Sequence, residues 1–523
     1  MDISQAQILI VMAIYMAIVI GIGLYYAKRA SASTENYLIG GRSLGPWVTA
    51  MAAEASDMSG YLLMGVPGVA YWFGLSEAAW TAIGLFIGTY LNWLFVAKRL
   101  RNYSHISGDA ITIPDFFSNR FKEDKKVILS IAALFILIFF TVYASSCFVT
   151  VGKLFSTLFD TKYITMMIVG AAFVVFYTFI GGFLAESASD FMQGIVMFGA
   201  LIVVLGGGLY VAGGLGAVVD NAKEIPGFFD FFGIANPVLV DGVQQVSETG
   251  APLFGEAGRY GILTIISTIS WGLGYFGMPH ILLKFMAINK PTDIKFSRRI
   301  ATVWCLISLT AAVGIGIVGR VLYPNALLTK SSAESIFVIT SIDLFIPIVA
   351  GVVMSGILAS TISSADSYLL IAASAISKSI YQGIMKKDAS DKQVLFMSRA
   401  TLLVIAIVGI LIALDEDSVI FSIVSFAWAG FGATFGPLML FSLFWKRTTR
   451  SGAIAGMVSG GSMVFIWYFL IKPHGGIWGV YELLPAFIVS CIAIVVGSLL
   501  SKEPSKEIQE EFEEVKAVTA GQI

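Results

Sequence analysis

The chain has 523 residues, of which 57% are apolar and 13% are charged, and its mean hydropathy is +0.84. Soluble domains average about 25% charged residues, so this composition excludes a soluble enzyme and a disordered chain. The formal net charge of −1 leaves no basic footprint for nucleic acid. Three cysteines and three histidines are too few for a disulfide framework or a metal cluster. The composition therefore predicts a polytopic membrane protein.

Apolar runs, split at charges and at Gly, Pro and Asn, predict thirteen transmembrane segments. They lie near residues 6–26, 43–67, 77–97, 127–157, 162–183, 187–213, 261–288, 299–322, 338–377, 397–414, 417–445, 452–471 and 479–500. We expect one transmembrane transport domain over residues 1–501, with an acidic outer loop at 214–260. A charged cytoplasmic tail follows at 502–523, predicted to be a solvated helix or disordered.

Lysine and arginine residues predict the orientation through the positive-inside rule. With the N-terminus outside, 26 of the 33 basic residues fall on the cytoplasmic side, and Lys284 is counted among them. The remaining seven are Lys153, Lys162, Lys223, Arg259, Arg320, Lys330 and Lys472. This asymmetry predicts an outer N-terminus, a cytoplasmic C-terminus and an odd number of segments.

The second segment, 43–67, carries an acid deep in the membrane. Asp57 lies about a dozen residues from either end, too far in to reach the interface. Ser59 and Gly60 weaken the helix beside it, and carbonyls freed at a break can coordinate a cation where they line a cavity. A kink tolerated for packing is the alternative, but the depth of Asp57 favours function. Glu54 is left open between function and an acid facing an aqueous vestibule.

The seventh segment, 261–288, contains WGLGYFGMPH, from Trp271 to His280. Three glycines and a proline within this stretch predict a broken helix. Paired broken segments in two halves are the best sequence pointer to a transporter site. The spacing of five segments between the second and the seventh predicts that the two halves are inverted.

The ninth segment presents a row of hydroxyl groups. Ser360, Ser363, Ser364 and Ser367 recur at steps of three and four residues, which places them on one helical face beside Asp366. Hydroxyl oxygens facing carbonyls at a helix break suit a small hard cation such as sodium. Small residues also serve helix packing in membranes, but the two broken helices favour a cation site.

Asp190 opens the sixth segment. An acid at that place either caps a helix N-terminus or serves as an exit-side cation ligand. The sequence leaves both alternatives open.

Six sequence blocks carry a resemblance to a known family. They are GGRSLGPWVTA (40–50), EASDMSGYLLMGVPG (54–68), FFTVYASS (139–146), YTFIGGFLA (177–185), WGLGYFGMPHILLKFMA (271–287) and FAWAGFGATFGP (426–437). From about residue 35 to residue 500 the chain resembles the sodium/solute symporter family, particularly its bacterial sodium/proline symporters.

The resemblance implies an all-α polytopic fold of thirteen transmembrane helices with discontinuous helices in a five-plus-five inverted-repeat core. The repeats would cover approximately residues 43–213 and 261–445. It further implies import of L-proline with sodium by alternating access, across the bacterial cytoplasmic membrane, with sodium as the bound ion.

The resemblance also assigns site residues. The sodium site would use backbone carbonyls near three residues and the hydroxyls of two more, namely Ala55, Met58 and Ser360, and Ser363 and Ser364. Asp57 matches the family's intramembrane acid. The positions around the substrate are Ser59, Gly60, Tyr61, Tyr143, Trp271, Tyr275 and Pro279. By analogy with related symporters, Asp190 and Ser367 would bound a second sodium site.

Four residues depart from the pattern of that subfamily. Tyr61 replaces Trp, Met278 replaces Gln, Glu54 stands where Gly is common, and Ser364 replaces Thr. These changes keep the cation chemistry and bear instead on the affinity and range of the substrate.

Other functions remain as alternatives. A symporter of another amino acid, a sugar acid or a vitamin would share the cation site, but a sugar pocket would want more Asn and Gln. A membrane sensor is disfavoured because the residues after 502 leave no room for a kinase. A channel would need a repeated filter, and an enzyme would need a catalytic cluster, and neither pattern is visible.

Overall fold

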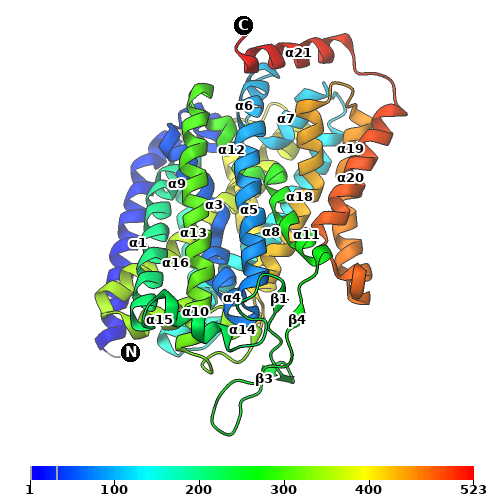
Figure 1. The fold of residues 1–523 in the computed structure, drawn as a ribbon. Helices are drawn as coiled ribbons and strands as arrows, with labels where there is room; N and C mark the ends of the chain where they lie inside the picture. The colour runs from blue at the N-terminus through cyan, green and yellow to red at the C-terminus, as the bar shows by residue number, and fades with distance from the viewer. Residues whose placement is uncertain (1–2, 31–32, 523) are drawn as a thin grey trace.

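The computed structural model describes residues 3–30 and 33–522, which form a bundle of helices running roughly along one axis (Figure 1). Nine of the described helices are long and apolar enough to cross a membrane, and a bent pair would make a tenth crossing. Two shorter apolar stretches, Tyr163–Phe179 and Leu483–Leu499, join them. The predicted multi-pass membrane class is confirmed, while the count of thirteen stays a prediction.

The bundle is built mainly from ten helices. They are α1 (Ile3–Ala30), α5 (Leu75–Leu91), α8 (Val127–Phe159), α9 (Tyr163–Val211), α13 (Ile294–Leu322), α16 (Pro347–Ser374), α17 (Asp391–Ile412), α18 (Ile420–Phe444), α19 (Arg450–Ile466) and α20 (Leu483–Leu499). Three of them continue in wider, π-helical turns. Helix α5 continues through η3 (Asn92–Val96) into α6 (Ala97–Ile106), α16 continues into η6 (Ala375–Met385), and α19 continues into η7 (Trp467–Ile471).

Two broken elements cross the centre of the bundle. The first consists of α3 (Pro46–Gly60), η2 (Tyr61–Gly65) and α4 (Val66–Phe73). The second consists of α11 (Ile262–Ile269), η4 (Ser270–Gly277) and α12 (Pro279–Ala287), which is bent by 44°. Both coincide with the segments predicted to be broken.

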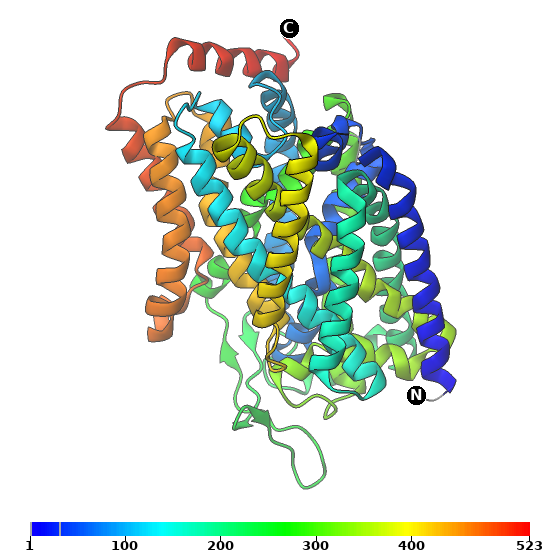
Figure 2. The ribbon, with the colours of Figure 1, turned by 180° about the vertical axis from the view of Figure 1, so that it is seen from behind.

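Short elements cover the two ends of the bundle. One end, which the sequence predicts to be cytoplasmic and which we call the inner face, carries α2 (Thr34–Ile39), η1 (Gly40–Arg42), α6, α7 (Ile113–Arg120), η5 (Pro291–Asp293) and α21 (Lys506–Ala520) (Figures 1 and 2). The opposite end, the outer face, carries α10 (Leu215–Lys223), α14 (Lys330–Ala333), α15 (Ile336–Leu344), η8 (Lys472–His474), η9 (Gly476–Gly479) and four strands.

The strands lie in the loop predicted at 214–260 and form two antiparallel pairs. β1 (Gly233–Ile234) pairs with β4 (Gly258–Arg259), with Gly233 opposite Arg259, and β2 (Leu239–Val240) forms a hairpin with β3 (Val243–Gln244).

The boundary of the ninth predicted segment, 338–377, is wrong. Helix α15 ends at Leu344, Phe345 and Ile346 are extended, and α16 begins at Pro347. Proline disfavours a helical residue before it and starts a helix readily, so Pro347 separates the two helices despite the continuous apolar sequence.

Of the two alternatives predicted for the tail, the helix is confirmed in α21, but this helix packs against the inner face rather than being fully solvated. Ile508, Phe512 and Val515 form one apolar stripe, and all three are buried. Phe512 lies 4.9 Å from the Arg99 guanidinium, and Lys98 Nζ donates to the Thr519 carbonyl at 2.6 Å. The tail is therefore an amphipathic helix, whose apolar stripe is easily overlooked among its many charged residues.

Candidate transport site

The first half of the site is the break in α3. Ser59 adopts φ 43° and ψ −164°, outside the helical region, and so interrupts the backbone ladder. At Gly60 a Cβ atom would lie 2.2 Å from Thr150 Oγ1, so only glycine fits against α8 there. Every residue from Thr49 to Gly60 is buried. The break therefore lies within protein, where irregular backbone is tolerated at membrane depth.

The second half is the break between η4 and α12. Met278 is extended, with ψ 108°, and Pro279 takes the first position of α12. Beside it, η4 packs backbone against backbone on α5, since Cβ atoms on Gly88 and Gly272 would meet the Gly272 and Gly84 carbonyl oxygens at 2.3 Å each. Glycine at these three positions lets the two elements approach closely.

The residues predicted to bind sodium come together between α3 and α16. Ser363 Oγ donates to the Ala55 carbonyl oxygen at 2.9 Å and lies 3.2 Å from the Ser360 carbonyl oxygen. Ser364 Oγ is buried and has no hydrogen-bond partner among the described residues. Met58 is buried directly before the break. The donor set consists of carbonyl and hydroxyl oxygens, the type that hard cations prefer.

Asp57 joins the two broken elements. Tyr275 OH donates to Asp57 Oδ2 at 2.7 Å, and Tyr143 OH approaches the Asp57 carbonyl oxygen at 3.4 Å. His280 Nε2 lies 3.6 Å from Asp57 Oδ1, which has no hydrogen-bond partner among the described residues. His280 was not predicted as a site residue, although its place directly after Pro279 in the break was an available signal.

A layer of aromatic rings lies on the outer side of this region. The Tyr61 ring stacks on Trp271 and on Phe421, with centroid distances of 5.4 and 5.3 Å. Trp271 also stacks on Tyr481 at 5.1 Å, and its carbonyl accepts from Trp428 Nε1 at 2.8 Å. Tyr61 and Trp271 were predicted, whereas Phe421 and Tyr481 were missed because they are distant from Trp271 in the sequence and meet it only through helix packing.

Glu54 does not face an aqueous vestibule. Its side chain is buried, and Trp93 Nε1 donates to Glu54 Oε1 at 3.4 Å. The indole of Trp93 from η3 covers the acid, a long-range contact that a local pattern does not reveal.

An ion cluster surrounds the predicted second sodium residues. Lys284 Nζ, from α12, donates to Glu186 Oε1 at 2.7 Å and to Asp190 Oδ2 at 3.2 Å, both from α9. Ser367 Oγ, from α16, bonds to the same Glu186 oxygen. Asp366 lies buried beside Ser367. An ammonium group therefore contacts the carboxylate that was predicted to hold a cation.

The assignment of Lys284 to the cytoplasmic loop charges is wrong, because its side chain is fully buried. The burial of Lys284 could not be predicted locally, because the acids that compensate its charge are distant in the sequence. Glu186 precedes it by 98 residues and Asp190 by 94.

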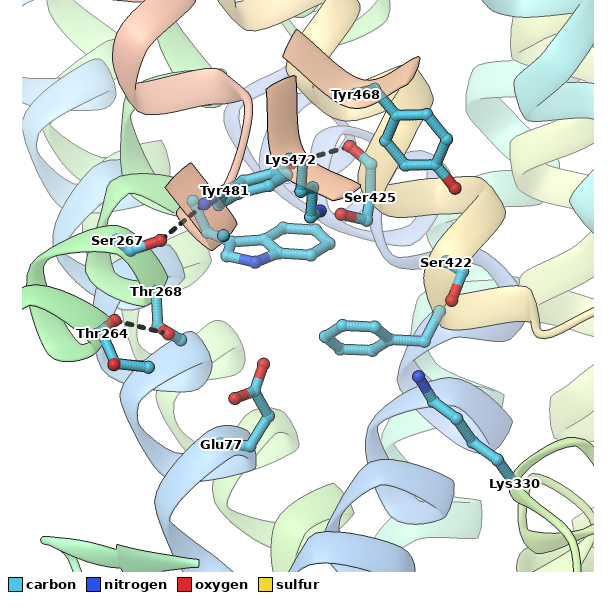
Figure 3. A pocket seen from close by; sticks show the side chains of 13 residues that line it. Glu77, Thr264, Ser267, Thr268, Lys330, Ser422, Ser425, Tyr468, Lys472 and Tyr481 are labelled. Carbon is cyan, nitrogen blue, oxygen red and sulfur yellow. Dashed lines mark hydrogen bonds between the residues drawn. The ribbon is translucent and has the colours of Figure 1, made fainter. Parts of the chain in front are cut away.

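A cavity of about 280 Å³ opens on the outer side of the aromatic layer (Figure 3). Its lining combines aromatic rings, hydroxyl groups and three charged side chains: Glu77, Thr264, Ser267, Thr268, Trp271, Lys330, Phe421, Ser422, Ser425, Tyr468, Lys472, Gly479 and Tyr481. Glu77 from α5 and Lys330 from α14 both point into it in Figure 3.

The Glu77 carboxylate is oriented by a tyrosine from the outer loop. Tyr260 OH donates to Glu77 Oε2 at 2.7 Å. Burial and the neighbouring Glu77 carboxylate raise the pKa of Tyr260 above its usual range, so the phenol keeps its proton and remains a donor.

Comparisons with known proteins agree on one family. A model of the sodium:solute symporter family matches residues 37–460. The chain is 40% identical over 518 residues to sodium/proline symporters from Staphylococcus aureus strains USA300 / TCH1516 and NCTC 8325 / PS 47. Each match covers 98% of this chain and 96% of the relative.

Solved structures resemble the fold. A Na+-coupled sialic acid symporter aligns with a TM-score of 0.75 at 16% identity, covering 96% of this chain and 99% of that chain. MhsT, solved with L-phenylalanine, aligns with a TM-score of 0.52 at 15% identity, covering 87% and 98%. At such identities the likeness supports the fold alone.

Proposed function

This chain belongs to the sodium:solute symporter family, and we propose that it imports L-proline together with sodium by alternating access. It is a sodium-coupled symporter, and its matched family and relatives are transporters rather than enzymes. The observation that carries the choice of proline is 40% identity to sodium/proline symporters over 98% of the chain.

We assign sodium to the oxygens between α3 and α16. The Ala55, Met58 and Ser360 carbonyls and the Ser363 and Ser364 hydroxyls supply up to five neutral ligands. The Ser363 hydroxyl already contacts two of these carbonyls, which favours the arrangement. The unpartnered Ser364 hydroxyl is a buried oxygen in need of a partner, and a bound cation provides one.

Asp57 links sodium to substrate through charge and connectivity. Its carboxylate is a few residues from the carbonyl ligands and receives a hydrogen bond from Tyr275 of η4. A cation beside α3 lowers the cost of the buried negative charge, and the Tyr275 contact transmits the position of Asp57 to the second broken helix.

The substrate pocket would lie between the two breaks. Seven residues line it in this proposal: Ser59, Gly60, Tyr61, Tyr143, Trp271, Tyr275 and Pro279. Proline has a small apolar ring that packs on Trp271, and a carboxylate that suits the N-terminus of α12 or the bound sodium. Its ammonium over an aromatic face gains about 1–2 kcal/mol.

Alternating access would arise from the two broken helices. An inverted repeat over approximately 43–213 and 261–445 would place them at equivalent positions, with opening to the inner face as α12 moves away from α9. We place the chain in the bacterial cytoplasmic membrane with an outer N-terminus and a cytoplasmic C-terminus.

Uptake of labelled L-proline into proteoliposomes tests this function. An inward sodium gradient should drive accumulation, and replacement of sodium by potassium should abolish it. Excess unlabelled proline should compete, and Asp57→Ala should be inactive. Accumulation without sodium dependence would contradict the cation assignment.

A symporter of another small solute is the second candidate. Tyr61 and Met278 differ from the Trp and Gln of the proline subfamily, and Tyr61 lies in the aromatic layer. Sodium-driven movement of another amino acid, a sugar acid or a vitamin, with no transport of proline, would favour this candidate.

A further inference from the structure

We propose that the cavity between Glu77 and Lys330 is an outer substrate subsite, which binds a zwitterionic amino acid before the amino acid enters the central pocket. The identity of that amino acid as proline rests on the proposed function. The volume of about 280 Å³ is close to the lower end of ligand pockets, about 300–1,000 Å³, and therefore suits a small solute.

The charges of the cavity match a zwitterion. Glu77 and Lys330 reach into the space from two different helices, α5 and α14, and within residues 3–30 and 33–522 neither forms an ion pair (Figure 3). Lys472 differs, since its ammonium binds Glu482 at 2.7 Å and is already compensated. The cavity therefore presents one charge of each sign that lies outside the ion pairs of the described residues. An amine or an acid alone would satisfy only one of them.

The rest of the lining suits the body of a cyclic amino acid. Trp271 and Phe421 supply apolar faces, and Ser422 also lines the cavity. Glu77 keeps one carboxylate oxygen free of the Tyr260 phenol, which binds the other oxygen. A positively charged ring nitrogen can therefore approach Glu77 while the ring lies on the aromatic surface.

Phe421, which lines the cavity, is hydrogen-bonded to the outer segment that also carries Lys330. Glu334 accepts hydrogen bonds from the backbone nitrogens of Ile420 and Phe421, each at 2.9 Å. Lys153 compensates Glu334 at 2.7 Å. A ligand held by Lys330 thus contacts a segment that also positions Phe421, which stacks on Tyr61 of the central layer.

Cysteine protection in the absence of sodium tests the subsite. Ser422→Cys is introduced into a Cys491→Ser background, because Cys147 and Cys305 are fully buried and Cys491 is partly exposed. Full-length protein in potassium buffer is labelled with a charged methanethiosulfonate reagent, with and without proline. We expect proline to slow labelling by about threefold at about two-thirds occupancy of the subsite, and by more as the site approaches saturation.

Matched variants test whether the protection of the Ser422→Cys thiol depends on the charges of Glu77 and Lys330. Lys330→Gln and Glu77→Gln should each remove the protection, expressed relative to the unprotected rate of the same variant. Pyrrolidine and cyclopentanecarboxylate, which each carry one of the two charges, should not protect. Thr249→Cys, in the distant outer loop, should be labelled equally with and without proline.

Three results would overturn the outer subsite: no protection at any proline concentration, protection only when sodium is present, or protection that survives both charge-removing variants. Sodium-dependent proline uptake by the same preparation tests the proposed function separately. Loss of that uptake with protection retained would refute the function and keep a zwitterion site. Normal uptake without protection would refute the subsite alone.

Discussion

Asp57 is the residue on which the two broken helices meet, and its partners give it a testable role. Tyr275→Phe removes the hydrogen bond to Asp57 Oδ2 and keeps the ring. A hydrogen bond to a charged group contributes about 1.5–3 kcal/mol, so we expect the sodium concentration for half-maximal uptake to rise at least about tenfold. Uptake assays over a sodium series measure this, and an unchanged sodium dependence would separate Tyr275 from coupling.

Two serines of α16 allow a matched comparison. Ser363→Ala removes a hydroxyl that bridges to α3, whereas Ser355→Ala removes one that bonds only within α16, to the Gly351 carbonyl at 2.8 Å. We expect the first change to weaken sodium dependence by about tenfold or more, and the second to leave it within about twofold. Equal effects would mean that the serines act through packing.

Lys284 binds Asp190, which the sequence predicts to bound a second sodium site. Lys284→Met would leave Glu186 and Asp190 buried without their cation, and breaking a buried pair costs about 3–5 kcal/mol. We expect the variant to unfold at a lower temperature, and added sodium to restore stability more than it stabilises the wild type. Thermal unfolding in detergent over a sodium series measures both. Lys284→Arg is the charge-preserving control, and equal sodium effects in all three proteins would argue against a second sodium at Asp190 and Ser367.

At the scale of elements, α21 holds the inner ends of several helices together. Phe512 contributes the buried ring of that contact, and Glu513 forms an exposed pair with Lys446 at 3.1 Å. Truncating a buried Phe costs about 3–5 kcal/mol, whereas surface pairs contribute little. We therefore expect Phe512→Ala, but not Glu513→Gln, to make residues 500–505 sensitive to limited proteolysis. Equal cleavage of the two variants would show that the apolar stripe does not hold the helix.

The broken elements were predictable because their causes are local. Gly60, the glycines of η4 and Pro279 mark the chain directly, and the structure breaks at those places. The helix of the C-terminal tail was one of two predicted alternatives, but its packing was not predicted. A stripe of Ile508, Phe512 and Val515 within a charged sequence becomes buried only because the inner face offers a surface for it. The helix boundary at Pro347 was missed because the predicted segment was drawn from its continuous apolar sequence, without regard to the proline.

At the scale of the whole molecule, the family and the membrane class followed from motifs and composition, while the partnerships across the bundle did not. Lys284 and Glu186 are separated by 98 residues, and Trp93 reaches Glu54 across 39. Such pairs form only when the helices pack together, so they cannot be predicted from local patterns in a single sequence. The same limit explains why Phe421 and Tyr481 were missed.

The orientation of the whole molecule gives a further prediction. Thr249→Cys lies in the outer loop, and Lys516→Cys lies on α21 at the inner face. In intact cells we expect an impermeant thiol reagent to label the first variant in a Cys491→Ser background, and to label the second only after permeabilisation. The reverse pattern would invert the topology predicted by the positive charges.

The glycines between α5 and η4 carry a consequence for how this protein can diversify. Gly84, Gly88 and Gly272 bring two backbones into contact with no side chain between them, so any larger residue would push the segments apart. A hydroxyl ligand such as Ser364 can be exchanged for threonine with its chemistry intact. Evolution toward new substrates should therefore vary the aromatic rings around the cavity, while the three glycines of this backbone contact stay fixed.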